Sequence, residues 1–140
     1  MVDPAGSAAP ERNGATTGAL GDAADGLLSL AEAPPTEDGR QVMLVGGEID
    51  MLTAPRLRGA LMPVVSVSGA DVVLVLDAVT FLGSNGLGVL VELSQQAEAV
   101  GAKFRLVCAN RTVSRPLTLT GLDQVLDFYE SADDLPPVGS

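Results

Sequence analysis

The stretch that most constrains this chain runs from residue 72 to residue 91 and has the sequence VVLVLDAVTFLGSNGLGVLV. Its first five residues are valine and leucine without polar alternation, which is typical of a strand buried on both faces of a parallel sheet. Asp77 ends this apolar run, and apolar residues then recur at three- and four-residue intervals, which predicts a helix over 85–100 that stops at Gly101. The glycine-rich corner between strand and helix carries Ser84, in the place where α/β sheets usually receive ligands and partners.

The flanking segments alternate between expected strands and helices. Strands are expected over residues 26–32, 41–45, 72–76, 103–108 and 125–129, and helices over 54–65, 85–100, 110–120 and 131–135. The first two strands are expected to pair as a hairpin, and the helix that Thr53 caps should kink or end near Pro63. Asn110 or Thr112 is expected to cap the third helix, which Gly121 closes. This alternation predicts an α/β domain with a largely parallel central sheet and helices packed on it.

The domain is expected to occupy residues 26–135. Residues 1–25 are rich in Ala, Gly, Pro, Ser and Thr and have almost no large apolar side chains, so we expect a flexible N-terminal tail. Residues 136–140 are expected to form a short C-terminal tail. With 46% hydrophobic residues in 140, the chain has enough apolar surface for one compact core.

Composition argues against several classes of function. The net charge of −10 disfavours nucleic-acid binding, which needs clustered Lys and Arg. The chain contains 0 histidines, so a Ser-His-acid triad is excluded. A zinc site would have to be built from one cysteine and carboxylates. The spacing of Gly83, Gly86 and Gly88 is not the dinucleotide fingerprint, and no phosphate loop is present. We therefore expect no enzyme active site, no metal site and no cofactor.

The sequence also suggests a cytoplasmic protein. The lone Cys108 cannot form an intramolecular disulfide and is expected to be a small buried apolar residue. No N-terminal stretch combines a basic region with an apolar core, and no apolar run approaches the ~20 residues that cross a bilayer.

Two interpretations of the corner stay open on these grounds. In the first, which the residues alone favour, Gly83, Gly86 and Gly88 allow a tight turn and close helix packing, while Ser84 caps exposed amides. In the second, Ser84 is a regulated surface, where a phosphate would add about −1.5 to −2 charges at a helix N-terminus that tolerates them. The effect of that phosphate would then fall on a docked partner.

Several blocks in order resemble the STAS domain of bacterial anti-sigma factor antagonists. They are GGEID followed by Thr53, then LVLDAVTFLGSNGLGVLVEL, GAKFRLVCA and TLTGLDQVLDFYES. The resemblance covers residues 27–135, and its most specific block is Phe81 to Leu87. It implies a STAS-like single domain with a mixed, mostly parallel sheet.

The resemblance also implies a function. In such proteins a serine in this block is phosphorylated by a partner that is both anti-sigma factor and serine kinase, and the unphosphorylated antagonist captures that partner and frees the sigma factor. The phosphoacceptor would be Ser84, and a serine phosphatase is a possible further partner. The implied partner-binding residues are Asp50, Thr53, Gly83, Ser84, Asn85, Gly86, Leu87 and Gly88.

This chain departs from the family pattern beside the serine, because Gly83 replaces the usual aspartate and Asn85 the usual second serine or threonine. Three alternatives follow. The domain could bind an anti-sigma factor without being phosphorylated, it could be an accessory subunit of a transporter or signalling complex, or it could bind a small molecule.

Overall fold

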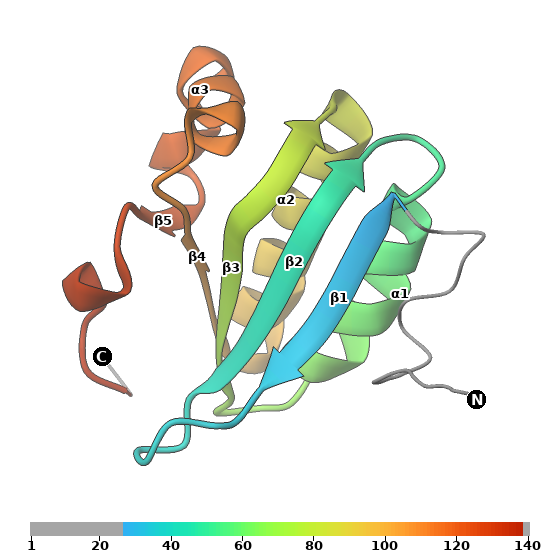
Figure 1. Cartoon of the computed structure of the whole chain (residues 1–140). Coiled ribbons are helices and arrows are strands. Elements are labelled where there is room, and N and C mark those ends of the chain that lie inside the picture. Colours follow the sequence, from blue (N-terminus) through green and yellow to red (C-terminus); the bar gives the residue numbers. More distant parts are fainter. Residues whose placement is uncertain (1–26, 139–140) are drawn as a thin grey trace, which may run out of the picture.

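The computed structural model describes residues 27–138 of the chain, so the tail expected over residues 1–25 lies outside the described part. One five-stranded sheet has the order β1-β2-β3-β4-β5 (Figure 1). The strands are β1 (Leu28–Ala33), β2 (Gln41–Ile49), β3 (Asp71–Leu82), β4 (Lys103–Val107) and β5 (Asp127–Tyr129). The helices are α1 (Ala54–Val65), α2 (Ser84–Val100) and α3 (Arg111–Thr120), with short 3₁₀ turns η3 (Leu122–Gln124) and η4 (Ala132–Asp134).

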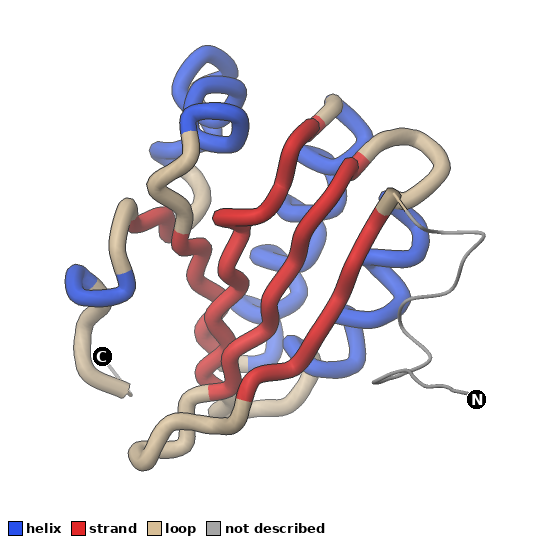
Figure 2. Tube along the Cα trace, in the orientation of Figure 1, coloured by secondary structure: helices blue, strands red, loops and turns tan. Residues whose placement is uncertain are grey.

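The sheet is mixed and mostly parallel, as the sequence predicts. β1 pairs antiparallel with β2 as the expected hairpin, and β2, β3, β4 and β5 run parallel. Helices α1 and α2 lie side by side against one face of the sheet (Figure 2). The core between these layers is aliphatic, and Leu57, Leu74, Leu90 and Leu106 in it are 0% exposed. Within residues 27–138, no helix combines the length and apolar character needed to cross a membrane.

Strand β3 is longer than predicted. The expectation that the strand ends at residue 76, just before Asp77, is wrong, because β3 has twelve residues in all and continues to Leu82. The second half of β2 continues beside it, pairing Gly46 with Ala78 and Ile49 with Leu82 after small register shifts. Buried and exposed positions are mixed in this extension, so the polar Asp77 is tolerated. The strand therefore reaches the glycine corner itself, and only Gly83 separates it from α2.

Helix ends follow the predicted signals more closely. Asn110 caps α3, since its side chain accepts a hydrogen bond from the Thr112 amide at 2.7 Å, and Gly121 ends that helix in a left-handed conformation. Gly101 ends α2 in the same way. As expected, α1 ends near Pro63, at Val65 two residues later, and the proline ring is exposed.

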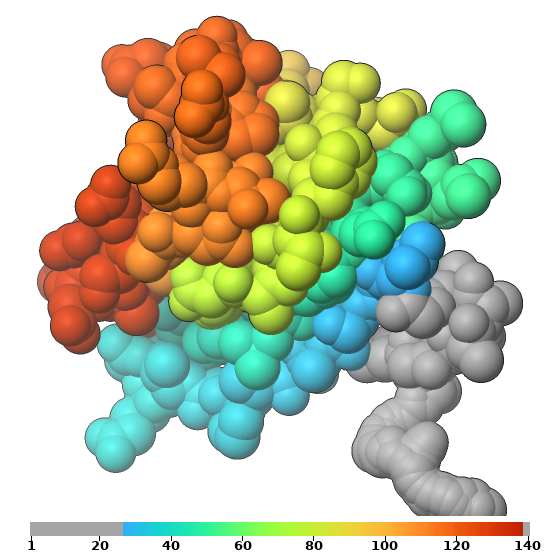
Figure 3. Space-filling model, turned by 45° about the horizontal axis from the view of Figure 1, so that its top comes forward, coloured from blue at the N-terminus to red at the C-terminus, as the bar shows by residue number. Residues whose placement is uncertain are grey.

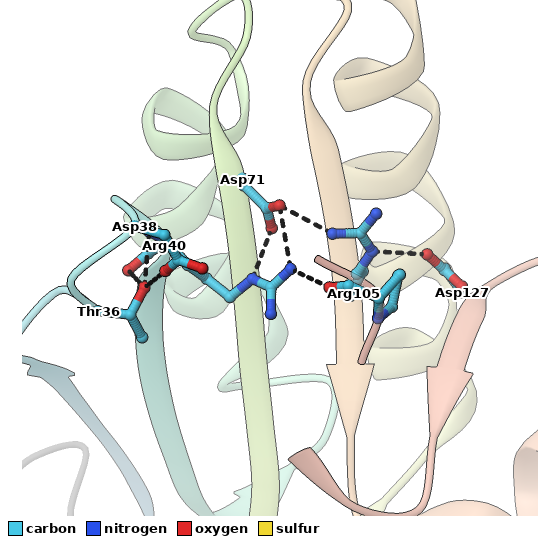
Figure 4. Close-up of polar contacts among 7 residues, drawn as sticks. Thr36, Asp38, Arg40, Asp71, Arg105 and Asp127 are labelled. Carbon is cyan, nitrogen blue, oxygen red and sulfur yellow. Dashed lines mark hydrogen bonds and ion pairs between the residues drawn. The ribbon is translucent and has the colours of Figure 1, made fainter. Parts of the chain in front are cut away.

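A buried ionic cluster links the strands at the end of the sheet where β3 begins, which is opposite to the end that carries Ser84. Figure 4 shows the side chains of this cluster. The Asp71 carboxylate, at the start of β3, accepts hydrogen bonds from Arg40 Nε at 3.1 Å, Arg40 Nη2 at 3.3 Å and Arg105 Nη1 at 2.8 Å. Arg105 Nε also donates to Asp127 at 3.1 Å. Arg40 Nη2 donates to the Pro136 carbonyl at 2.7 Å, so structural contacts extend one residue beyond the expected end of the domain.

Candidate functional site

The corner predicted from the sequence lies where two parallel strands end side by side. Ile49 and Leu82, the last residues of β2 and β3, are paired, and the Gly83 amide donates to the Ile49 carbonyl at 2.9 Å. The arrowheads of both strands end at the same edge of the sheet (Figure 1). The β2–α1 loop, residues 50–53, and the start of α2 therefore form one continuous surface, which we call the switch edge.

Ser84 is exposed and is the first residue of α2. The expectation that it caps the helix is wrong, because Gly83 occupies the cap position in an extended conformation, with φ −92° and ψ 178°. No side chain accepts a hydrogen bond at this cap. The Ser84 hydroxyl is therefore presented at the positive end of the α2 dipole without serving as its cap.

Only one of the three corner glycines is required by close packing. A Cβ at Gly86 would lie 2.5 Å from Ile49 Cγ2 and 2.7 Å from Leu82 Cδ1, whereas a Cβ at Gly88 would meet nothing within 4 Å. At Gly83 the nearest atom to a Cβ would be Phe81 Cε2, at 3.1 Å. The architectural interpretation therefore holds for Gly86, which lets the first turn of α2 rest on the end of β2.

Alanine at these two helix positions should have opposite effects on stability. We expect Gly86→Ala to lower the free energy of unfolding by about 1–3 kcal/mol, because the methyl group overfills the contact with Ile49 and Leu82. Gly88→Ala should raise it by about 0.5–1 kcal/mol through helix propensity. Urea unfolding of both variants checks this. Equal stabilities would mean that Ile49 and Leu82 move aside at little cost.

The β2–α1 loop is held by its own polar groups. The Asp50 carboxylate accepts hydrogen bonds from the Leu52 amide at 2.9 Å and the Thr53 amide at 3.0 Å. The hydrogen bond from the Thr53 amide is the main reason that the pKa of Asp50 lies below its usual value. Thr53 Oγ1 donates to the Glu48 carbonyl at 2.8 Å and accepts from the Asp50 amide at 2.9 Å. Thr53 precedes α1 as predicted, but its hydroxyl bonds to the loop and not to the helix amides.

The residues expected to bind a partner all lie at the switch edge, but they are unequally accessible. Ser84, Asn85 and Gly88 are exposed, and Asp50 and Gly83 are half-buried. Thr53 and Leu87 are only 3% and 9% exposed, and Gly86 is buried. The buried members shape the edge from beneath, while the exposed ones are available for contact.

Sequence reasoning missed three large apolar side chains at this edge. Met51 is 69% exposed and Leu52 is 78% exposed in the β2–α1 loop, and Phe81 is 50% exposed near the end of β3. Figure 3 brings the edge forward and shows the green atoms of the loop beside the yellow-green atoms of the end of β3. The available signal was the placement of Met51 and Leu52 between two polar loop residues, where no core position accounts for them.

Among residues 27–138, the cysteine and the acidic side chains form neither a reactive thiol nor a metal-binding cluster. Cys108 is 0% exposed, as predicted, and its Sγ lies 3.4 Å from the Leu76 carbonyl oxygen. Burial raises the pKa of its thiol to about 11, so the thiol is protonated at neutral pH. Within residues 27–138, no three or more Cys, Asp or Glu side chains come together in a way that could hold a metal ion.

The sheet order and the serine at the switch edge define a STAS-type domain, and comparison with known proteins agrees. Residues 34–135 match the STAS domain family, and the chain belongs to it. It is 36% identical to the anti-sigma-F factor antagonist RsfB of Mycobacterium tuberculosis over 106 residues, which cover 76% of this chain and 86% of that protein. It is 34% identical to the anti-sigma-B factor antagonist of Bacillus subtilis over 89 residues, covering 64% of this chain and 81% of that one.

A solved structure extends the likeness to three dimensions. The crystal structure of an anti-sigma factor antagonist from Mycobacterium paratuberculosis superposes with a TM-score of 0.65 at 39% sequence identity. The match covers 76% of this chain and 90% of that one. The family resemblance and the fold class expected from the sequence are thus confirmed.

Proposed function

We propose that this protein is a cytoplasmic anti-sigma factor antagonist that is switched by phosphorylation of Ser84. The observation that carries the proposal is the position of Ser84, exposed on the first turn of α2 beside an ordered loop and exposed apolar side chains. The names of the relatives support an anti-sigma factor as the partner. Capture of that factor by the unphosphorylated protein would release its sigma factor.

The covalent step requires a partner that is a serine kinase. The Ser84 oxygen attacks the γ-phosphorus of ATP, the bond to the bridging oxygen of ADP breaks, and the serine proton leaves to a base of the kinase or to solvent. The product carries about −1.5 to −2 charges at neutral pH. The uncapped amides and the dipole of α2 tolerate that charge, so the fold remains while docking is opposed. A serine phosphatase would reverse the switch.

Phosphate mapping tests the proposal directly. The purified protein is mixed with ATP and, one at a time, with anti-sigma factors of the serine-kinase class from its source organism, and the modified residue is located by mass spectrometry. We expect one phosphate on Ser84 and none on Ser84→Ala. Modification at another residue, or a partner that binds without modifying the protein, would remove Ser84 from this role.

One observation favours a second candidate, in which the protein binds its anti-sigma factor constitutively. Gly83 and Asn85 replace the residues that usually flank the serine in the family, and the missing carboxylate is a possible contact to the kinase. In this case binding occurs at the same edge and Ser84 stays unmodified.

A further inference from the structure

One face of the sheet is left uncovered by the helices of residues 27–138. Helices α1 and α2 lie together against the other face, and Figures 1 and 2 show β1, β2 and β3 with nothing over the face turned to the viewer. Sheets of parallel strands almost always carry helices on both faces. Since β2 to β5 run parallel here, the described part of the chain supplies two of the three layers that such a sheet normally has.

A row of apolar residues crosses this open face. It takes one residue from each strand, and its members are cross-strand partners in sequence: Ala31, Leu44, Val75, Val107 and Tyr129. The residue that precedes each of them packs in or against the hydrophobic core, and none of the five does. Because successive side chains of a strand point to opposite faces, all five point to the open face. We call them the apolar row.

The middle of the row is accessible. Leu44 is 42% exposed, Ala31 is exposed, and Val75 is half-buried. Tyr129 at the far end is also half-buried, whereas Val107 beside it is 4% exposed. The part of the row on β1, β2 and β3 is therefore the part that another molecule can cover.

The residues on either side of the row are small or apolar. Towards the switch edge lie Ser29, Gly46 and Ala78, and a Cβ at Gly46 would be 2.8 Å from Ser29 Oγ and 3.0 Å from Ala78 Cβ. On the other side Val42 and Val73 pair with each other and lead to the ionic cluster. These short side chains leave room for a helix to approach the sheet closely.

The exposed charges around the row are acidic. Those within two residues of a row member along the chain are Glu32, Asp77, Asp127 and Glu130. The one arginine that close, Arg105, is 2% exposed and bonded to Asp71 and Asp127. A second copy of this chain, with its net charge of −10, or residues 1–26, with four acids and one arginine, would bring like charges to this margin. The charges therefore favour an occupant that carries cations beside its apolar surface.

We propose that the apolar row is a docking surface for an amphipathic helix of a partner protein, in which an apolar stripe is flanked by Lys and Arg. The helix supplies the missing third layer of the sheet, its stripe covers Leu44 and Val75, and its cations face the acidic margin. None of the row residues belongs to the switch edge. The surface is thus a second interaction site, whose occupation does not require any modification of Ser84.

A peptide probe tests the chemistry of the surface. The probe is a labelled helical peptide of about 18 residues, or five turns, with leucines on one face and lysines beside them. Fluorescence anisotropy measures its affinity for the parent, Leu44→Ser and Ala31→Lys at about 0.15 M salt, where weak surface charge effects are screened. Both variants should bind about tenfold more weakly or worse. Both should also keep the parent's unfolding midpoint, because the replaced side chains are exposed.

Matched controls separate the row from any exposed apolar residue. Val67 is 56% exposed in the α1–β3 connection, so Val67→Ser and Val67→Lys should bind the peptide as the parent does. A peptide with glutamates in place of the lysines should bind the parent about tenfold more weakly or worse. Row variants that bind like the parent, or equal affinity for the two peptides, would overturn the inference.

Cross-linking identifies what covers the row in the cell. Leu44 is replaced by the photo-crosslinking amino acid benzoylphenylalanine in protein expressed in its source organism, and Val67 is replaced in the control. We expect an adduct at position 44 alone, in which mass spectrometry maps the cross-linked peptide to a Lys- and Arg-flanked amphipathic helix. The purified partner should then bind the parent about tenfold more tightly than it binds Ala31→Lys.

The other cross-linking results contradict the proposal. An adduct with a second copy of this chain, or with residues 1–26, would show that the chain covers its own open face. No adduct at position 44 above that at position 67 would show that the face stays uncovered. Each result is read without reference to the state of Ser84, so failure here leaves the proposed function untouched, and the reverse also holds.

Discussion

Asp71→Ala is expected to lower the free energy of unfolding by about 3–5 kcal/mol, a large part of the stability of a small domain. The side chain of Asp71 is 3% exposed and pairs with Arg40 and Arg105, whose side chains are 10% and 2% exposed. Removal of this carboxylate leaves two buried guanidinium groups short of their shared anion. Urea unfolding followed by circular dichroism measures the loss.

An exposed ion pair in the same molecule provides the control. Arg58 and Glu92 lie 3.3 Å apart with side chains 50% and 51% exposed, so Glu92→Gln should change the unfolding free energy by less than about 1 kcal/mol. A triple variant, Arg40→Met, Asp71→Leu and Arg105→Met, should regain most of the lost stability, because no buried charge is then left unpaired. Asp127 loses Arg105 as its partner, but its side chain is 48% exposed and stays solvated. If Asp71→Ala costs no more than Glu92→Gln, water reaches the two arginines and the cluster is not buried in solution.

The ionic cluster was not foreseen because nothing local in the sequence marks it. Arg40, Asp71, Arg105 and Asp127 are separated by 22 to 34 residues along each contact, and each taken alone is a charge near the start of a strand. Only the parallel alignment of strands β2, β3, β4 and β5 brings these four side chains to one end of the sheet. Such long-range pairs are invisible to hydrophobic periodicity.

The order and type of the elements were predictable for the opposite reason. The unbroken apolar run at the start of β3 and the three- and four-residue spacing in α2 are local patterns, and Gly101, Gly121 and Asn110 mark helix ends by their own chemistry. The end of β3 was missed because Asp77 looks like a strand terminus. The neighbouring second half of β2 carries the strand past it to Leu82.

The position of the glycine corner in the fold was predicted from the sequence, but the side chains exposed beside it were predicted only in part. The glycine-rich corner drew attention to Ser84, and the family resemblance added Asp50 and Thr53. The side chains of Asp50 and Thr53 turned out to organise the loop. The apolar residues displayed by that organisation, Met51 and Leu52, carry no motif, because their meaning depends on exposure, which only the fold defines.

Replacing Ser84 with glutamate should weaken binding to the anti-sigma factor about a hundredfold or more, which corresponds to about 2.8 kcal/mol. The substituted carboxylate places a fixed negative charge at the switch edge, where docking strips away its water. The fold should not suffer, because an acidic side chain in the first turn of a helix interacts favourably with the helix dipole, by about 0.3–1 kcal/mol. Loss of binding with unchanged or slightly raised stability is thus the signature of a switch.

Two control variants separate charge from shape and position. Ser84→Ala removes the hydroxyl without adding charge and should bind as tightly as the parent. Gln95→Glu adds the same charge to an exposed position of α2, eleven residues and ~16 Å further along the helix, and should also bind normally. Titration calorimetry of all three variants against one anti-sigma factor gives the comparison. If Ser84→Glu binds as tightly as the parent, charge at this edge does not govern docking, and the constitutive binding module becomes the better description.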